Sequence, residues 1–337
     1  MDSLLTKSAA LAAMLLAIQA GLAADGIVFR TAVAENADPA AAGKAAATEL
    51  KAAMGDAELK AVIVVDCFED RPLKEQALDG VAEVIDRSLL FGGASYGMFT
   101  QGGTSEWDAV ALLGIGGDGI EVEAALERDM GAAGLSLEEN EEELTQALGG
   151  AGAGLARQLP GVGEAALLLL FADAHSPKNQ LLLDGVQSVT GPDLPITGGC
   201  VNKNAGQNWV YYQGKLYTDS AIAIALTGDF EVAQSGRQAQ DNDAVIATAG
   251  ESSSEALARL DAEPFAVIAF DCAGRMGKLD DPGEELAAIQ EVVGTTVPLF
   301  GCYCAGEFGP ADPKESADGA TCRGMGWHVM VSALAGR

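Results

Sequence analysis

Ala61-Val-Ile-Val-Val-Asp66-Cys67 is a continuous apolar run that ends at an acidic residue, and the pattern around it occurs three times in the chain. In each copy an amphipathic segment follows the run, and a Gly-rich turn comes next. The copies lie about one hundred residues apart, which is the length of a small domain rather than of a solenoid unit. The other two runs are Leu168-Leu-Leu-Phe171-Ala-Asp173 and Ala266-Val-Ile-Ala-Phe270-Asp271-Cys272.

Matched spacing separates this repeat from the general likeness of strand–helix–strand arrangements. The first two copies share Leu-Asp-Gly-Val, at 78–81 and 183–186, and a Gly-rich turn follows each at a similar distance. The spacing therefore indicates an internal repeat. Continuous apolar strands are typical of burial on both faces. We expect an α/β (α+β mixed) fold, in which repeated strand–helix–strand–helix–strand–strand units form mixed sheets that helices cover.

Glycine-rich and polar stretches mark the joints between the repeats, at 149–163 and 234–243. We predict a region of two repeats over 25–233, divided into 25–125 and 126–233. The third repeat occupies 234–337. The strand expected at 120–125 would extend the sheet of the first repeat.

The first 24 residues have the features of a signal peptide. Lys7 precedes the apolar stretch from Ala9 to Ile18, and small residues at 21 and 23 suit a signal peptidase. We therefore predict export to the periplasm or the exterior. The alternative is an ordinary buried helix in a cytoplasmic protein. The run is too short to span a bilayer, so we expect no stable membrane insertion.

The chain is strongly acidic, with 49 Asp and Glu against 20 Lys and Arg and a formal net charge of −29. Such a surface repels phosphate backbones, which disfavours sequence-independent binding of nucleic acid. The same charge disfavours docking on anionic membranes.

The six cysteines do not identify a compartment, and their disulfide state stays open. Cys67 and Cys272 end apolar runs, where a thiol behaves as a small buried hydrophobe. Cys302 and Cys304 would point to the same face of one strand. Only two histidines could complete a metal site, so we expect neither a metal nor a cofactor.

Ligands gather at the carboxyl ends of buried strands, and all three repeats place an Asp there. Asp66, Asp173 and Asp271 are therefore candidates for binding. The alternative is that each carboxylate caps a helix or closes a turn, because Asp readily accepts hydrogen bonds from free backbone amides.

The third repeat is the richest in chemistry. Cys272-Ala-Gly-Arg275 sets a thiol and a guanidinium at one strand end, and Tyr303, Gly306 and Glu307 follow the neighbouring strand. Arg275 could hold a ligand carboxylate in a bidentate pair, and Glu307 could hold an ammonium. Alternatively, the two side chains pair with each other.

At these residues the chain resembles the FIST sensory domains. Phe270-Asp-Cys272-Ala-Gly-Arg275 is similar to the family's Cys-x-x-Arg element, and Gly301-Cys-Tyr-Cys-Ala-Gly306-Glu307 is similar to its C-terminal signature. Pro195-Ile-Thr-Gly198-Gly199 resembles the end of the N-terminal FIST region. The likeness implies an N-terminal FIST region over 25–233 and a C-terminal FIST region over 234–337.

The resemblance implies a stand-alone sensory protein that binds a small polar molecule, amino acids being one proposed class, and that has a signalling protein as a partner. Two other functions stay open. One is a thiol-dependent hydrolase or transferase that uses Cys272 or Cys200 with His175. The other is a protein-interaction module without a ligand. The predicted ligand-binding residues are Cys272, Arg275, Tyr303, Gly306, Glu307, Asp173, Gly198 and Gly199.

Overall fold

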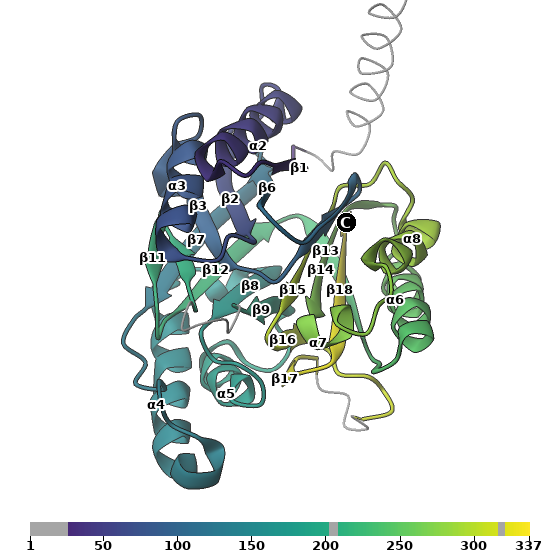
Figure 1. Cartoon of the computed structure of the whole chain (residues 1–337). Helices are drawn as coiled ribbons and strands as arrows, with labels where there is room; N and C mark the ends of the chain where they lie inside the picture. Colours follow the sequence, from purple (N-terminus) through teal and green to yellow (C-terminus); the bar gives the residue numbers. More distant parts are fainter. Residues whose placement is uncertain (1–25, 202–207, 316–320) are drawn as a thin grey trace, which may run out of the picture.

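The computed structural model describes residues 26–201, 208–315 and 321–337, so the signal peptide predicted at 1–24 lies outside the described residues. Within these ranges the chain forms three mixed sheets of six strands each, together with seven α-helices (Figure 1). This confirms the predicted mixed α/β class.

The three sheets share one strand order and one set of strand directions. In each, the buried central strand lies between an antiparallel and a parallel neighbour, and a short antiparallel hairpin ends the sheet. The first sheet runs β1 (Val28–Glu35), β6 (Ala109–Gly116), β2 (Leu59–Asp66), β3 (Leu90–Ala94), β10 (Val210–Tyr212), β11 (Lys215–Tyr217). The second runs β7 (Ile120–Glu127), β12 (Ala221–Gly228), β8 (Leu167–Ala172), β9 (Ile196–Cys200), β16 (Glu307–Gly309), β17 (Arg323–Met325). The third runs β13 (Phe230–Gln238), β18 (His328–Gly336), β14 (Pro264–Cys272), β15 (Leu299–Cys304), β4 (Met98–Thr100), β5 (Gly103–Ser105).

Each unit contributes its hairpin to another unit's sheet. The β4–β5 hairpin joins the third sheet, β10–β11 joins the first, and β16–β17 joins the second. Equivalent backbone hydrogen bonds mark the three joins: Ala94 N to Trp209 O at 3.0 Å, Cys200 N to Gly306 O at 2.7 Å, and Tyr303 N to Gly97 O at 2.9 Å. No unit therefore completes its own sheet, and the three are interlocked in a cycle.

The unit boundaries in the structure differ from the predicted ones. β7 pairs with β12 of the second sheet, so the strand expected to extend the first sheet begins the second unit. β6 is already paired on both sides, with β1 and β2, which leaves no edge there for another strand. The expected divisions at 125/126 and 233/234 accordingly fall inside β7 and β13.

Paired helices cover the outer face of each sheet (Figure 1). Several of them begin at an Asp or Ser whose side chain accepts hydrogen bonds from amides of the first turn, as at Asp38, Ser136 and Asp281. None of the helices in the described residues is both long and apolar enough to cross a bilayer. The helices are α2 (Pro39–Met54) and α3 (Arg71–Ala82) on the first sheet, α4 (Leu137–Arg157) and α5 (Asn179–Thr190) on the second, α6 (Asn242–Leu257) and α8 (Pro282–Val293) on the third, and the short α7 (Ala273–Met276).

The repeated Leu-Asp-Gly-Val is explained by close helix packing. A Cβ on Gly80 of α3 would lie 2.1 Å from the Ala40 carbonyl oxygen of α2, and one on Gly185 of α5 would lie 2.2 Å from the Gly149 carbonyl oxygen of α4. Only glycine permits such an approach of two backbones. In the third unit Gly250 of α6 lies farther from α8, so the glycine of the motif is not required there.

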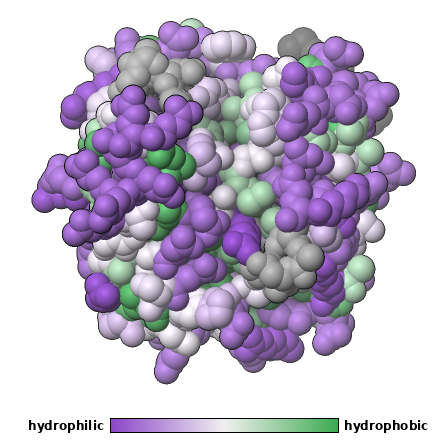
Figure 2. Space-filling view, turned by 90° about the horizontal axis from the view of Figure 1, so that it is seen from below, coloured by the Kyte–Doolittle hydropathy of each residue, from purple (hydrophilic) through white to green (hydrophobic). Residues whose placement is uncertain are grey.

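The inner faces of the three central strands meet in one apolar core, with residues such as Val65, Phe171 and Phe270 from the three units. Separate apolar layers lie between each sheet and its helices. Seen from below, the surface is mainly hydrophilic, and its hydrophobic residues form small patches (Figure 2). The ends of the central strands thus lie between an inner core and an outer helical layer, and the direction of each side chain decides which one it enters.

Candidate functional site

The three strand-end Asp residues do not occupy equivalent positions. The amide of Cys67 donates to the Ala109 carbonyl at 3.2 Å, and the equivalent bond in the second unit is from Asp173 N to Ser220 O at 2.9 Å. Asp173 therefore corresponds to Cys67, one residue beyond Asp66. Because successive side chains of a strand point to opposite faces, Asp66 and Asp271 face the helices, whereas Asp173 faces the other side.

In the first unit, the strand-end carboxylate is fully buried and neutralised. Lys74 Nζ donates to Asp66 Oδ1 at 2.9 Å, and the Tyr211 hydroxyl donates to Oδ2 at 2.5 Å. Burial raises the pKa of the Tyr211 hydroxyl well above its usual range, so this group stays a donor. The cluster ties the β10 strand of the exchanged hairpin to the first sheet.

Arg275, predicted to hold a ligand carboxylate, is instead enclosed in the third unit with no exposed surface. Its Nε donates to Asp271 Oδ1 at 2.8 Å, its Nη2 to Glu285 Oε1 at 2.8 Å, and its Nη1 to the Thr248 hydroxyl at 3.0 Å. Arg275 therefore pairs with neither a ligand nor Glu307 in this conformation. Arg275 belongs to the short helix α7, which begins at Ala273, and its side chain points toward α6 and α8.

Tyr303, another predicted site residue, belongs to the same buried cluster. Its hydroxyl donates to Glu285 Oε2 at 3.0 Å. Burial raises the pKa of Glu285 and of Asp271, and the Arg275 guanidinium opposes this in both. The cluster anchors α6, α8 and β14 to one another.

Cys272, Glu307 and Gly199 come together on the opposite, inner face. Glu307 of β16 is paired in register with Gly199 of β9, where a Cβ would lie 2.2 Å from Cys304 Sγ. Gly198 lies beside it, against the Leu170 carbonyl. Glu307 Oε2 accepts from the His328 amide at 3.2 Å, and Oε1 has no hydrogen-bond partner among the described residues. The predicted site is thus divided: Arg275 and Tyr303 lie between the third sheet and its helices, whereas Glu307, Gly198 and Gly199 lie in the second sheet.

The thiols near this cluster are buried and protonated. All six cysteines are free, and Cys302 and Cys304 point to the same side with their sulfur atoms 3.6 Å apart. Burial raises the pKa of Cys272 to about 12 and that of Cys200 well above its usual range. A nucleophilic cysteine needs the opposite shift.

Asp173 lines a cavity of about 210 Å³ at the strand ends of the second unit. Residues from four segments of the chain form its wall, so several turns converge on it. The lining residues are Ala132, Ala133, Gly134, Asp173, Ala174, His175, Lys178, Asn208 and Asp219.

The Asp219 amide, the Asn208 side chain and His175 surround the Asp173 carboxyl. Its Oδ2 accepts from the Asp219 amide at 2.8 Å, and its Oδ1 lies 3.6 Å from His175 Nε2. Burial raises the pKa of Asp173 to about 6, an effect that the hydrogen bond from the Asp219 amide partly opposes. Near neutral pH the group is therefore a carboxylate in a poorly hydrated site, which favours a cationic partner.

The other two charged groups of the cavity have different roles. Both Asp219 oxygens accept backbone hydrogen bonds, from Gly131 at 2.8 Å and Ala132 at 3.1 Å. Lys178 Nζ donates to the Leu135 carbonyl and lies 3.5 Å from the Ala132 carbonyl. Asp219 thus shapes the cavity wall, and Lys178 brings a positive charge to it.

Gly306 does not line the cavity, but it packs against the loop that forms part of the cavity wall. At φ 136° it lies so close to the loop after β8 that a Cβ would be 2.9 Å from the Ser176 side chain. This loop carries His175 and Lys178, so Gly306 sets their backbone position.

Lys178 and Asp219 were missed at the sequence level, although one signal for Asp219 was present. Asp108, Asp219 and Trp327 lie just before the last long strands of the three units, and all three have positive φ, at 48°, 46° and 63°. Asp219 thus lies at a turn that all three units share, although the residue type at this position differs between units. No repeat marks Lys178, whose position depends on the loop after β8.

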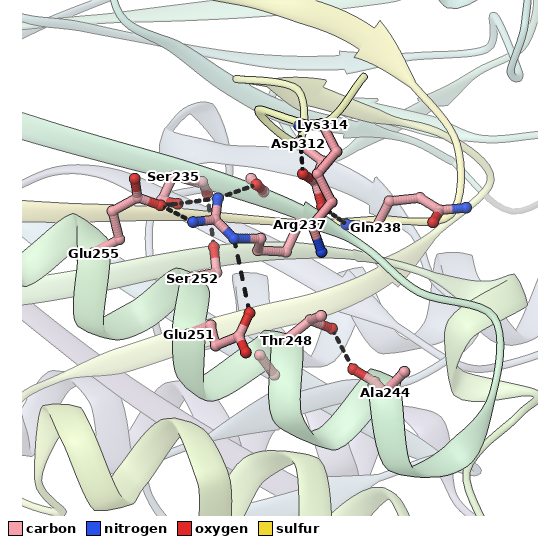
Figure 3. Close-up of polar contacts among 12 residues, drawn as sticks. Ser235, Arg237, Gln238, Ala244, Thr248, Glu251, Ser252, Glu255, Asp312 and Lys314 are labelled. Carbon is pink, nitrogen blue, oxygen red and sulfur yellow. Dashed lines mark hydrogen bonds and ion pairs between the residues drawn. The ribbon is translucent and has the colours of Figure 1, made fainter. Parts of the chain in front are cut away.

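A second polar cluster lies between β13 and α6 (Figure 3). Arg237 pairs with Glu255 and lies 4.0 Å from Glu251, and Ser235 donates to Glu255 at 2.7 Å. These groups are satisfied by one another, so the cluster stabilises the third unit and offers little to a ligand.

A family model for the FIST N domain matches residues 60–263. No curated protein matches the sequence. Among solved structures, cyanuric acid hydrolase from A. caulinodans is similar over 92% of this chain and 99% of that chain, with a TM-score of 0.47 and 12% identity. Phosphoribosylformylglycinamidine synthase II from Thermotoga maritima is similar over 93% and 73%, with a TM-score of 0.25 and 10% identity. At these TM-scores, neither likeness indicates a shared site or activity.

Proposed function

The chain belongs to the FIST N domain family, whose members are sensory domains that bind small ligands, and we propose that it binds a small zwitterion of the amino-acid kind in the cavity at Asp173. One observation carries this proposal: a single small cavity is lined by a carboxylate and by an ammonium group, Asp173 and Lys178.

The charges of the cavity suit the two ends of such a ligand. An ammonium group would pair with the Asp173 carboxylate, and a carboxylate would pair with Lys178. Asp219 adds a second carboxylate to the cavity wall, where the Gly131 and Ala132 amides hold it in place.

The volume of the cavity favours a small molecule. Drug-sized ligands occupy pockets of about 300–1,000 Å³. At about 210 Å³ the cavity is below that range, so amino acids with short side chains are the best candidates.

The remaining parts of the proposal concern the whole chain. We propose that residues 234–337 form the C-terminal FIST region, which the shared strand order of the third sheet supports. We also propose that the protein is exported and that a signalling protein reads its ligand state.

A thermal-shift screen of the full chain against the amino acids tests the ligand. We expect at least one with a short side chain to raise Tm, and Asp173→Asn and Lys178→Met each to remove that rise. Asp184→Asn on α5 is the matched control, because Asp184 is exposed and does not line the cavity. A rise that persists in both cavity variants, or the absence of any rise, contradicts the proposal and favours an interaction module.

A further inference from the structure

In the second and third units, a hydrogen bond joins the second long helix of the unit to the hairpin that enters its sheet. In the first unit a hollow lies at the equivalent place. In the second unit Gln180 of α5 accepts from the Gly324 amide of β17 at 2.9 Å. In the third, Gln290 of α8 donates to the Gln101 carbonyl, between β4 and β5, at 2.8 Å. In the first unit a hollow of about 370 Å³ lies between α3 and the β10–β11 hairpin.

Cationic side chains gather at this hollow, although the chain has only 20 Lys and Arg. Arg71, Arg87 and Lys215 line it, together with the carboxylates Glu75 and Asp79. A protein with a formal charge of −29 thus places three of its few cations around one opening.

Both carboxylates are already paired. Arg71 Nε donates to Glu75 at 2.7 Å, and Arg87 pairs with Asp79. The terminal nitrogens of Arg71 and the ammonium of Lys215 make no hydrogen bond to any described residue. The hollow therefore offers unused donors and one unpaired positive charge.

Two of the three cationic groups, Arg71 and Arg87, are held before any ligand arrives. Arg71 lies over the Trp209 ring, 5.3 Å from its centre. Arg87 Nη1 donates to the Gly214 carbonyl at 2.9 Å, and Gly214, at φ 64°, lies so close that a Cβ would be 2.5 Å from the Arg87 side chain. Less conformational entropy is lost on binding when donors are fixed in advance.

We propose that this hollow binds a small oxyanion, a carboxylate or a phosphate, through Arg71 and Lys215. A guanidinium with two free terminal nitrogens suits the planar geometry of a carboxylate or two oxygens of a phosphate. The net negative charge of the chain does not prevent this, because charges farther away than about 8 Å are largely screened at physiological salt. The anion would join α3 of the first unit to the hairpin of the second.

Titration with inorganic phosphate and, separately, with malonate tests the site. The full chain is held at constant ionic strength with sodium chloride, and Tm is followed. We expect one or both anions to raise Tm, and Arg71→Met and Lys215→Met each to weaken apparent binding at least about fivefold, since each removes a charge-assisted hydrogen bond. The two probes distinguish a phosphate ligand from a carboxylate ligand.

Three controls keep the test specific. Lys314→Met removes an exposed Lys outside the hollow and should leave binding unchanged. Lys215→Arg should retain binding, and so should Asp173→Asn, because the Asp173 cavity is a different site. The inference is overturned if neither anion raises Tm beyond chloride, or if Arg71→Met and Lys215→Met bind as the wild type does.

Discussion

Replacing Arg275 by Met should destabilise the protein strongly and leave the ligand site intact. The side chain has no exposed surface, and its guanidinium lies between Asp271 and Glu285. Removing one partner of a buried ion pair costs about 3–5 kcal/mol. The carbonyl of Val245 also loses this donor, at 3.1 Å, but it still accepts from the Thr248 hydroxyl at 3.1 Å. The ion-pair loss alone is a large part of the usual free energy of unfolding, about 5–15 kcal/mol.

The loss should depend on pH in a defined direction. Without Arg275, burial raises the pKa of Asp271 and Glu285 further above their values in the unfolded chain. A group with a raised folded-state pKa stabilises the fold below its unfolded-state pKa, and this contribution is lost as pH rises through the folded-state pKa. Urea unfolding should therefore show a larger deficit at pH 8 than at pH 5.

Two further variants separate this interpretation from a general loss of packing. Glu285→Gln in the Arg275→Met background should recover part of the free energy, because one unpaired buried charge is removed. Arg157→Met, at an exposed position of α4, should change stability by less than about 0.5 kcal/mol. A loss below about 1 kcal/mol in Arg275→Met, combined with loss of an amino-acid-induced shift, would refute the structural role and restore Arg275 as a ligand contact.

Three other outcomes are expected. Because the pKa of Asp173 is raised to about 6, ionisation of this buried carboxyl destabilises the fold increasingly as pH rises through about 6. Asp173→Asn should therefore raise Tm at pH 8 and make no difference to Tm near pH 4. Equal effects on Tm at both pH values would contradict the raised pKa. Gly80→Ala and Gly185→Ala should each cost about 1–3 kcal/mol in urea unfolding because a Cβ meets a backbone carbonyl, whereas Gly250→Ala should cost less; equal costs would contradict the packing. Iodoacetamide at neutral pH should label the native protein slowly and the unfolded protein at all six cysteines, and rapid native labelling of Cys272 would support the thiol enzyme.

Much of the fold could be predicted from the sequence, because apolar runs and Gly-rich turns recur at matched spacing. The exchange of hairpins could not. β4, β10 and β16 are three residues long, and such short strands do not specify which sheet they join. That choice depends on contacts between residues far apart in the chain.

The candidate site was harder to predict because it depends on single-residue register. Ala172 takes the place in β8 that Asp66 and Asp271 take in their strands, which moves Asp173 to the other face. In the third unit, Cys272 and Arg275 are close in sequence. The Arg275 side chain nevertheless points into the layer between the sheet and its helices, whereas the Cys272 thiol points to the other face of the sheet. The sequence therefore predicts which segments meet, but it does not predict the direction of these side chains.

A crystal structure of the protein with the amino acid that raises Tm most is the most direct test of the proposed ligand site. We expect density in the cavity at Asp173, with the ligand ammonium within hydrogen-bond distance of the Asp173 carboxylate and the ligand carboxylate toward Lys178. Density elsewhere, or a ligand held by Arg275 and Glu307, would contradict it.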